Sequence, residues 1–135
     1  ILKYNKINCL VINEIELRHE MRDKVSDVTF LAKKLQNKIN INKIVITRGK
    51  FGAILIDKKT KKIFNCPAFT TSVVDKVGAG DTMLSIICLF INAKTPDELS
   101  LFLGNIAGSF SVQVMGNREH IVKKSFLKQI ETILK

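Results

Sequence analysis

The feature that most limits the fold of this chain is a glycine-rich loop that runs directly into an apolar segment. The loop reads Val73-Val-Asp-Lys-Val-Gly-Ala-Gly-Asp-Thr82, and the apolar run Met83–Ile91 follows it. Glycine backbones reach conformations that aim successive N–H groups into one concavity. The run predicts a helix from about Gly80 to Asn92. The loop then lies at a helix N-terminus, where an anion is favoured.

Asp81, at the end of this loop, has two interpretations. Aspartate commonly caps a helix N-terminus. A carboxylate also repels the phosphate that such a loop would hold, so its presence suggests a base that takes a proton from an attacking hydroxyl in phosphoryl transfer. The lysine that follows the last glycine of a P-loop is absent, so a nucleotide would be held by another architecture. The residue pattern alone leaves both interpretations open.

The first half of the chain predicts two buried strands and two helices. The strands are Cys9–Ile12 and Lys43–Thr47, and Asn13 is a candidate N-cap for a short helix after the first strand. A second helix is expected from about Val25 to Gln36. Its apolar positions point inward, and its outward positions are Lys33, Lys34 and Gln36. After a glycine-punctuated turn, the segments 53–57 and 62–65 form a hairpin around the lysine-rich turn 58–62.

Two further helices are expected after the glycine-rich loop and its helix. Thr95 is a candidate cap, Pro96 suits a first helical position and Glu98 completes a capping box, so one helix runs from there to about Gln113. A last helix covers about 123–134. The expected order of strand, helix, strands and then several helices indicates an α/β layered fold, and we find no repeat or linker that would divide residues 1–135.

Composition limits the remaining function classes. No stretch reaches the ~18 apolar residues of a membrane span, so we expect no membrane segment. The net charge of +10 raises a nucleic-acid alternative, but the excess lysines are dispersed. Trp is absent and there is one Tyr, so bases lack a stacking platform and we expect no nucleic-acid partner. Three separated cysteines without a Cys-x-x-Cys pair suit a reducing compartment, the cytoplasm; Cys88 is expected to be buried.

The segment 14–23 offers weaker candidates. His19-Glu-Met-Arg-Asp23 begins like a metalloprotease helix but has Asp where the second His belongs, so a solvated helix face is expected rather than a metal site. Arg18 and Arg22, four residues apart, are candidates for phosphate contact, although exposure to solvent is the expectation for both.

Four motifs, in order, give the chain a family resemblance that covers nearly all 135 residues. Asp75-Lys-Val-Gly-Ala-Gly-Asp81 resembles the D-T-x-G-A-G-D signature of the ribokinase-like (PfkB) carbohydrate kinases. Asn13-Glu-Ile-Glu16 resembles the family's N-x-x-E motif, and Thr47-Arg-Gly-Lys-Phe-Gly52 its T-x-G-x-x-G turn. Gly104-Asn-Ile-Ala-Gly108 resembles the late helix that helps to wall the adenine site. The residues after Asp81 resemble the kinases of ADP-heptose synthesis more than ribokinase proper.

The resemblance implies ATP-dependent phosphoryl transfer to a sugar or sugar-phosphate hydroxyl, with Mg²⁺. Asp81 would be the catalytic base, and the N–H groups of Gly78, Ala79 and Gly80 the anion hole. Asn13 and Glu16 would organise Mg²⁺ through water. The residues implied to lie along the nucleotide are Thr47, Gly49, Gly52 and Asn105. A candidate K⁺ site, as in some members, would use Asp75 and the carbonyls of Val77 and Gly116.

The family's domain is about twice the length of this chain, and its sugar-binding residues come from the N-terminal half. We therefore expect the C-terminal portion of a ribokinase-like three-layer fold, whose partners are the missing N-terminal half and a small-molecule sugar, and which is inactive alone. A homodimer is also conceivable within this resemblance. Lys76 replaces the usual Thr of the signature, with a role that the sequence leaves open. The alternative is a non-catalytic nucleotide-binding or regulatory module derived from such a kinase.

Overall fold

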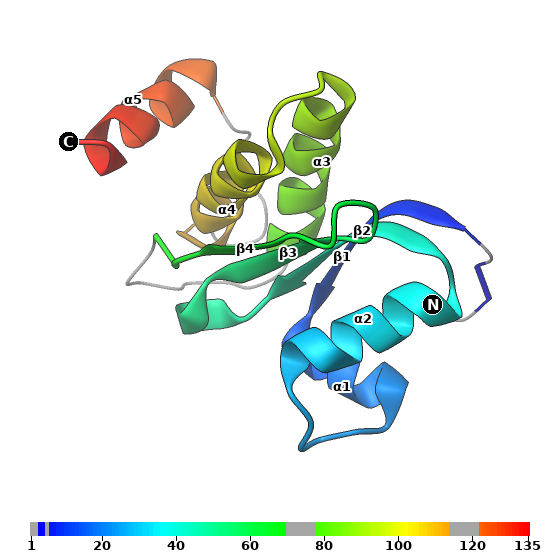
Figure 1. The fold of residues 1–135 in the computed structure, drawn as a ribbon. Coiled ribbons are helices and arrows are strands. Elements are labelled where there is room, and N and C mark those ends of the chain that lie inside the picture. Colours follow the sequence, from blue (N-terminus) through cyan, green and yellow to red (C-terminus); the bar gives the residue numbers. More distant parts are fainter. Residues whose placement is uncertain (1–2, 5, 70–77, 114–121) are drawn as a thin grey trace.

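A computed structural model describes residues 3–4, 6–69, 78–113 and 122–135. Within these ranges it describes the side chains of all residues except 112 and 113. In the described residues, one strand, two α-helices and three further strands make up the first part of the chain, and three helices close it (Figure 1). The elements in order are β1 (Ile7–Asn13), α1 (Glu14–Met21), α2 (Val28–Lys38), β2 (Ile41–Thr47), the 3₁₀ turn η1 (Gly49–Phe51), β3 (Ala53–Asp57), β4 (Ile63–Cys66), α3 (Ala79–Asn92), α4 (Asp97–Gln113) and α5 (Lys123–Ile133).

The four strands form one mixed sheet in the order β1-β2-β3-β4. β1 and β2 are parallel and are connected through α1 and α2, whereas β3 and β4 are the expected antiparallel hairpin. The register places four residues in one row across the sheet, namely Asn13, Thr47, Ala53 and Cys66. This row marks the edge at which the parallel strands β1 and β2 end.

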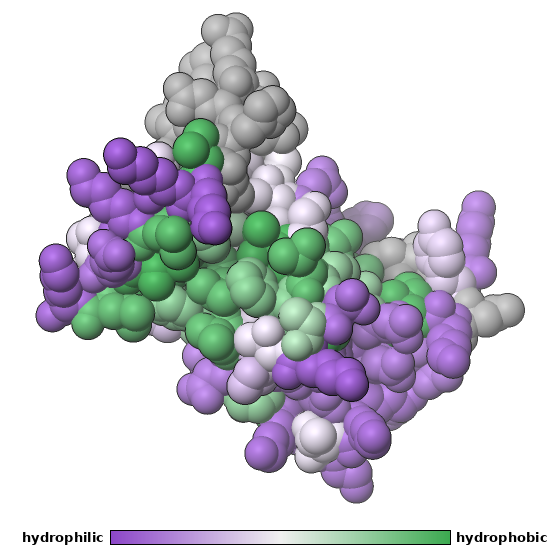
Figure 2. Space-filling model, turned by 90° about the horizontal axis from the view of Figure 1, so that it is seen from above, coloured by the Kyte–Doolittle hydropathy of each residue, from purple (hydrophilic) through white to green (hydrophobic). Residues whose placement is uncertain are grey.

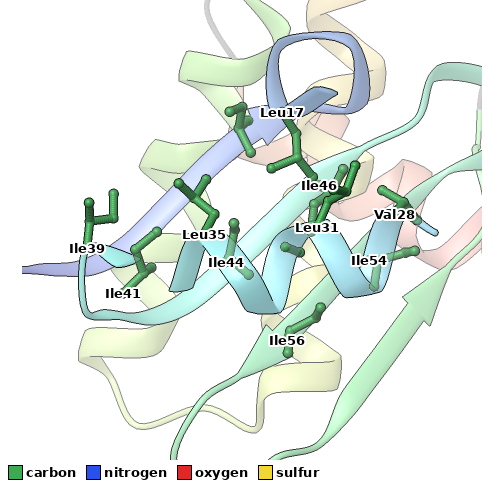
Figure 3. Close-up of a cluster of buried hydrophobic side chains, with 12 residues drawn as sticks. Leu17, Val28, Leu31, Leu35, Ile39, Ile41, Ile44, Ile46, Ile54 and Ile56 are labelled. Carbon is green, nitrogen blue, oxygen red and sulfur yellow. The ribbon is translucent and has the colours of Figure 1, made fainter. Parts of the chain in front are cut away.

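Alternating side chains of the strands feed two separate cores, one on each face of the sheet. On the first face, Ile12, Ile44 and Ile54 pack against α1 and α2 (Figure 3). On the second face, Val45 and Leu55 pack against α3 and α4. Figure 1 shows the result as three layers, with α1 and α2 on one side of the sheet and α3 and α4 on the other. The expected three-layer α/β fold is confirmed.

The helix expected from Val25 starts three residues later, at Val28, because Asp27 caps it. The Asp27 carboxylate accepts hydrogen bonds from the backbone N–H groups of Thr29 and Phe30, at 2.8 and 3.0 Å. Val25 lies before this cap and is 93% exposed. The expectation that Gln36 faces solvent is wrong: its side-chain amide is buried and donates to the carbonyl of Ile56 at 3.0 Å.

α3 and α4 form a closely packed helical hairpin on the second face of the sheet. A β-carbon added to Gly104 of α4 would lie 2.4 Å from Cγ1 of Ile87 in α3, so only a glycine admits this approach. α4 begins at Asp97, one residue after the expected position of Pro96. The expectation that Cys88 is buried is wrong: Cys88 is exposed, although it lies beside Cys9 of the edge strand β1.

None of the helices in the described ranges combines the length and the apolar character needed to cross a bilayer.

Candidate active site at the carboxyl edge of the sheet

The edge at which β1 and β2 end collects most of the residues predicted to be functional. Asn13 is the last residue of β1 and pairs in register with Thr47, the last residue of β2. In open α/β sheets, ligands bind at the carboxyl ends of the parallel strands. Two motifs that lie 34 positions apart in the sequence are thereby brought side by side at the edge where a ligand is expected.

Asn13 and Glu16 form a reciprocal capping box at the start of α1, which confirms Asn13 as its N-cap. The Glu16 N–H donates to Oδ1 of Asn13 at 2.8 Å, and the Asn13 N–H donates to Oε2 of Glu16 at 3.1 Å. Glu16 remains exposed, and among the described residues nothing else binds its carboxylate. Mg²⁺ prefers carboxylate oxygen and keeps several waters, so this pair fits an ion held largely through water. No cluster of three or more metal-ligating side chains occurs in the described ranges.

The turn after β2 is compact and requires glycine. The Arg48 N–H donates to the carbonyl of Gly52 at 2.8 Å, and the Gly52 N–H donates to the carbonyl of Gly49 at 3.0 Å. Gly49 and Gly52 have φ values of 56° and 80°, in the region that side chains disfavour. The turn returns the chain to β3 and leaves Thr47 and Gly49 at the carboxyl edge.

α3 begins at Ala79, close to its expected start, with Gly78 as the N-cap in a left-handed conformation, φ 85°. The carbonyl of Gly78 accepts the first helical hydrogen bond from the Thr82 N–H at 2.9 Å. Gly78 has no side chain to bind the first-turn N–H groups, so those of Ala79, Gly80 and Asp81 lack an intrahelical partner. The side chain of Asp81 stands exposed in this first turn.

Contacts along α3 and α4 place this helix start at the same edge as Asn13 and Thr47. Cys88, late in α3, lies beside Cys9, early in β1. At the other end of the hairpin, a β-carbon on Gly108 of α4 would lie 3.5 Å from the carbonyl oxygen of Ala79. The N-terminus of α3 therefore points toward the carboxyl edge of the sheet.

Asn105 of α4 anchors this edge from the side of β4. Its side-chain amide donates to the carbonyl of Pro67 at 2.5 Å and contacts Sγ of Cys66 at 3.4 Å. Cys66 belongs to the row that includes Thr47. Asn105 thus lies at the same edge as the turn after β2, with its amide occupied by the chain that follows β4.

The sequence did not single out Glu14 and Arg48, which join two of the motifs. The Glu14 carboxylate accepts from Nε of Arg48 at 2.8 Å and from Nη2 of Arg18 at 2.8 Å. These hydrogen bonds, that to Arg48 foremost, lower the pKa of Glu14 below its usual value, against the opposing effect of partial burial. The signal was available in part: Arg48 directly follows the predicted strand Lys43–Thr47, and Glu14 follows Asn13, the cap predicted after the strand Cys9–Ile12.

The remaining candidates are placed as follows. Arg18 is half-buried in its pair with Glu14, so the expectation that it is solvent-exposed is wrong. Arg22 and His19 are exposed, as expected. Asp75, Lys76, Val77 and Gly116 lie outside the described residues, so the candidate K⁺ site has no structural description.

Comparison with known proteins identifies the family to which the chain belongs. Residues 2–124 match the model of the pfkB family carbohydrate kinases, and the chain belongs to that family. It is 28% identical over 120 residues to the bifunctional protein HldE of Campylobacter fetus, covering 87% of this chain and 26% of that protein. It is 27% identical over 114 residues to the 2-dehydro-3-deoxygalactonokinase of Haloferax volcanii, covering 84% of this chain and 35% of that protein.

Solved structures show the same fold. The ribokinase of Arabidopsis thaliana, complexed with ribose and ATP, matches with a TM-score of 0.81 at 23% identity, over 94% of this chain and 42% of that one. Phosphofructokinase-2 of Escherichia coli, in complex with potassium, matches with a TM-score of 0.80 at 21% identity, over 98% of this chain and 43% of that one. The chain has the ribokinase-like fold and spans less than half the length of these proteins.

Proposed function

We propose that this chain is the C-terminal, nucleotide-side portion of a carbohydrate kinase that moves the γ-phosphoryl group of ATP to a hydroxyl of a sugar or sugar phosphate. The observation that carries the proposal is the convergence of separate motifs on one edge of the sheet. Asn13 and Thr47 are paired there in register, and the first turn of α3 with Asp81 points to the same edge. Family membership supports the same class of reaction.

In this proposal Asp81 is the general base. Its carboxylate takes the proton of the acceptor hydroxyl as the hydroxyl oxygen bonds to the γ-phosphorus, and the bond from that phosphorus to the bridging oxygen of ADP breaks. The N–H groups of Gly78, Ala79 and Gly80 stabilise the charge that develops on the phosphoryl oxygens. The exposure of Asp81 supports this role, because a base must be reachable by the acceptor.

The nucleotide and Mg²⁺ are assigned to the neighbouring motifs. Asn13 and Glu16 hold water molecules of the ion, and the bound ion offsets phosphate charge. The proposed nucleotide-binding residues are Thr47, Gly49, Gly52 and Asn105. A monovalent cation is assigned to Asp75, Val77 and Gly116, and the structurally similar phosphofructokinase-2 of Escherichia coli has been solved in complex with potassium.

The rest of the kinase domain is proposed to dock on β1 and the outer face of α3. β1 is an edge strand, yet Cys9, Leu10 and Val11 make it apolar on both faces, as in an inner strand of a parallel sheet. Leu89 of α3 is 66% exposed. Seen from above, apolar side chains gather in a band across the molecule (Figure 2). These surfaces suit the missing half that supplies the sugar site.

The proposal is tested by measuring ADP release with ATP, Mg²⁺ and a panel of sugars and sugar phosphates. Two samples are compared, this chain alone and the longer protein that includes its upstream half. We expect acceptor-dependent turnover in the longer protein and none in the isolated chain. The alternative, a non-catalytic nucleotide-binding module, predicts nucleotide binding by both samples and turnover by neither.

A further inference from the structure

Glu14 occupies a position between the two motifs assigned to Mg²⁺ and to the nucleotide. It is the residue after Asn13 and the first residue of α1, and its partner Arg48 is the residue after Thr47. One carboxylate oxygen, Oε2, accepts from Nε of Arg48 at 2.8 Å. The bond therefore ties the start of α1 to the turn after β2 at the point where both leave the sheet.

Further contacts with Arg18 and Phe51 orient the side chains of Glu14 and Arg48. The second carboxylate oxygen, Oε1, accepts from Nε and Nη2 of Arg18 at 3.0 and 2.8 Å. Nη1 of Arg18 in turn donates to the carbonyl of Ser26 at 2.9 Å. On the other side, the Arg48 guanidinium lies 5.7 Å from the centre of the Phe51 ring. Both carboxylate oxygens of Glu14 are engaged, and Arg48 is held between Glu14 and Phe51.

The strength of this connection follows from its charge and its burial. A charge-assisted hydrogen bond is about twice as strong as a neutral one, and the side chains of Glu14 and Arg48 are only 22% and 29% exposed. Pairs that are fully exposed to solvent contribute little. This pair is partly shielded from solvent, and it joins the residue after Thr47 to the residue after Asn13.

We infer that Glu14 and Arg48 are positioning residues that couple the Mg²⁺ motif to the nucleotide turn, so that Mg²⁺ bound near Glu16 strengthens binding of ATP at Thr47 and Gly49. The inference rests on the proposed function, which assigns those two roles. Neither Glu14 nor Arg48 has to touch the nucleotide. Their effect is to keep two backbone segments at a fixed separation.

The test measures ATP binding to the 135-residue chain by NMR titration, with Mg²⁺ and with EDTA in its place. The ratio of the two dissociation constants is the enhancement by Mg²⁺. In Arg48→Gln and in Glu14→Gln, we expect this enhancement to fall by at least about fivefold, the lower end of ordinary coupling between sites. Binding in EDTA stays within about twofold of wild type, and the double variant is no worse than either single variant.

Two controls separate coupling from loss of folding. Lys33→Gln removes an exposed charge from α2 and keeps the wild-type enhancement. Arg48→Lys retains the charge and one donor toward Glu14, and restores part of the enhancement. The dispersion of the amide spectrum and a thermal melt are recorded for every variant.

The possible results are distinct. Wild-type enhancement in both Arg48→Gln and Glu14→Gln overturns the inference and leaves the proposed function standing. Equal weakening of binding with and without Mg²⁺ also overturns it, because that is the result of a merely structural role. Failure of the wild-type chain to bind ATP at millimolar concentrations contradicts the proposed function itself, and the inference falls with it.

Discussion

A β-carbon placed on Gly52 would lie 2.0 Å from the carbonyl oxygen of Cys66. The turn that follows β2 is therefore packed directly against the backbone at the end of β4. Because Thr47 precedes this turn and Asn105 binds Pro67 just after Cys66, the contact holds together two parts of the proposed nucleotide site.

We predict that Gly52→Ala destabilises the chain far more than Gly49→Ala. Both glycines have positive φ, which costs a side chain about 1 kcal/mol, but a β-carbon on Gly49 meets nothing within 4 Å. At Gly52 the obstacle is backbone and cannot rotate away, so we expect a loss of about 3 kcal/mol or more. Urea unfolding of the two variants measures the difference. Equal losses would show that the contact with Cys66 is relieved at little cost.

A second prediction concerns acid stability and the ion pairs at the opposite edge of the sheet. Lys43 binds both Asp57 and Asp97, the latter at 2.5 Å. Burial alone would raise the pKa of Asp57, but hydrogen bonds from Lys43 and Thr60 outweigh it and lower this pKa from 3.8 to about 2. A lowered carboxyl pKa stabilises the fold above the unfolded value, and this contribution, about 2 kcal/mol, is lost as pH falls from about 4 to about 2.

The measurement is the free energy of unfolding as a function of pH for wild type and Asp57→Asn. We expect the variant to be less stable at neutral pH and to lose less stability on acidification over that window. Glu131→Gln, which removes an exposed carboxylate on α5, is the matched control and follows the wild-type profile. If wild type and Asp57→Asn lose stability in parallel as the pH falls, Asp57 is not the source of this acid-dependent loss.

The three cysteines are predicted to differ in reactivity. Cys88 is exposed, whereas Cys9 is half-buried and Cys66 is buried. Burial, with a contribution from the Cys88 thiol, raises the pKa of Cys9 to about 12, and burial raises the pKa of Cys66. Since the thiolate is the reactive form, iodoacetamide should modify Cys88 first in the native chain, as read by peptide mass spectrometry. Cys88→Ser should leave the native chain almost unlabelled.

The raised pKa of Cys9 makes the stability of the fold depend on pH in alkaline solution. A thiol whose pKa is raised in the folded state is held in its protonated form by the fold. Cys9 therefore contributes stability below its unfolded pKa of 9.0, and this contribution is lost as pH rises toward 12. Cys9→Ser should show a smaller loss of stability than wild type across that window. If Cys9→Ser loses as much stability as wild type over this pH range, the alkaline loss of stability belongs to other groups.

Local signals in the sequence predicted most of the elements. Asn13 caps α1 because its side chain accepts a hydrogen bond from the N–H of Glu16, only three residues later in the sequence. The hairpin of β3 and β4 and the start of α3 after Gly78 are likewise local. The family resemblance likewise rests on short motifs that are read directly from the residues.

The errors involve contacts between residues far apart in the sequence. Gln36 is buried because its amide reaches the carbonyl of Ile56, 20 residues away, which no helical periodicity reveals. The apolar run predicts that Cys88 is buried, but Cys88 lies beside the edge strand β1, where it is exposed. The pair of Glu14 and Arg48 depends on the parallel register of β1 and β2, so it follows from the topology rather than from any single segment.

The central proposal is that Asp81 is the base of a phosphoryl transfer, and it is tested most directly by Asp81→Asn in the longer protein that includes this chain and its upstream half. Both the turnover number with ATP and a sugar acceptor and the dissociation constant of ATP are measured. We predict that turnover falls by at least ~10²-fold, the ordinary contribution of a general base, while ATP binding is retained. Near-normal turnover in Asp81→Asn would contradict the account and remove Asp81 from the mechanism.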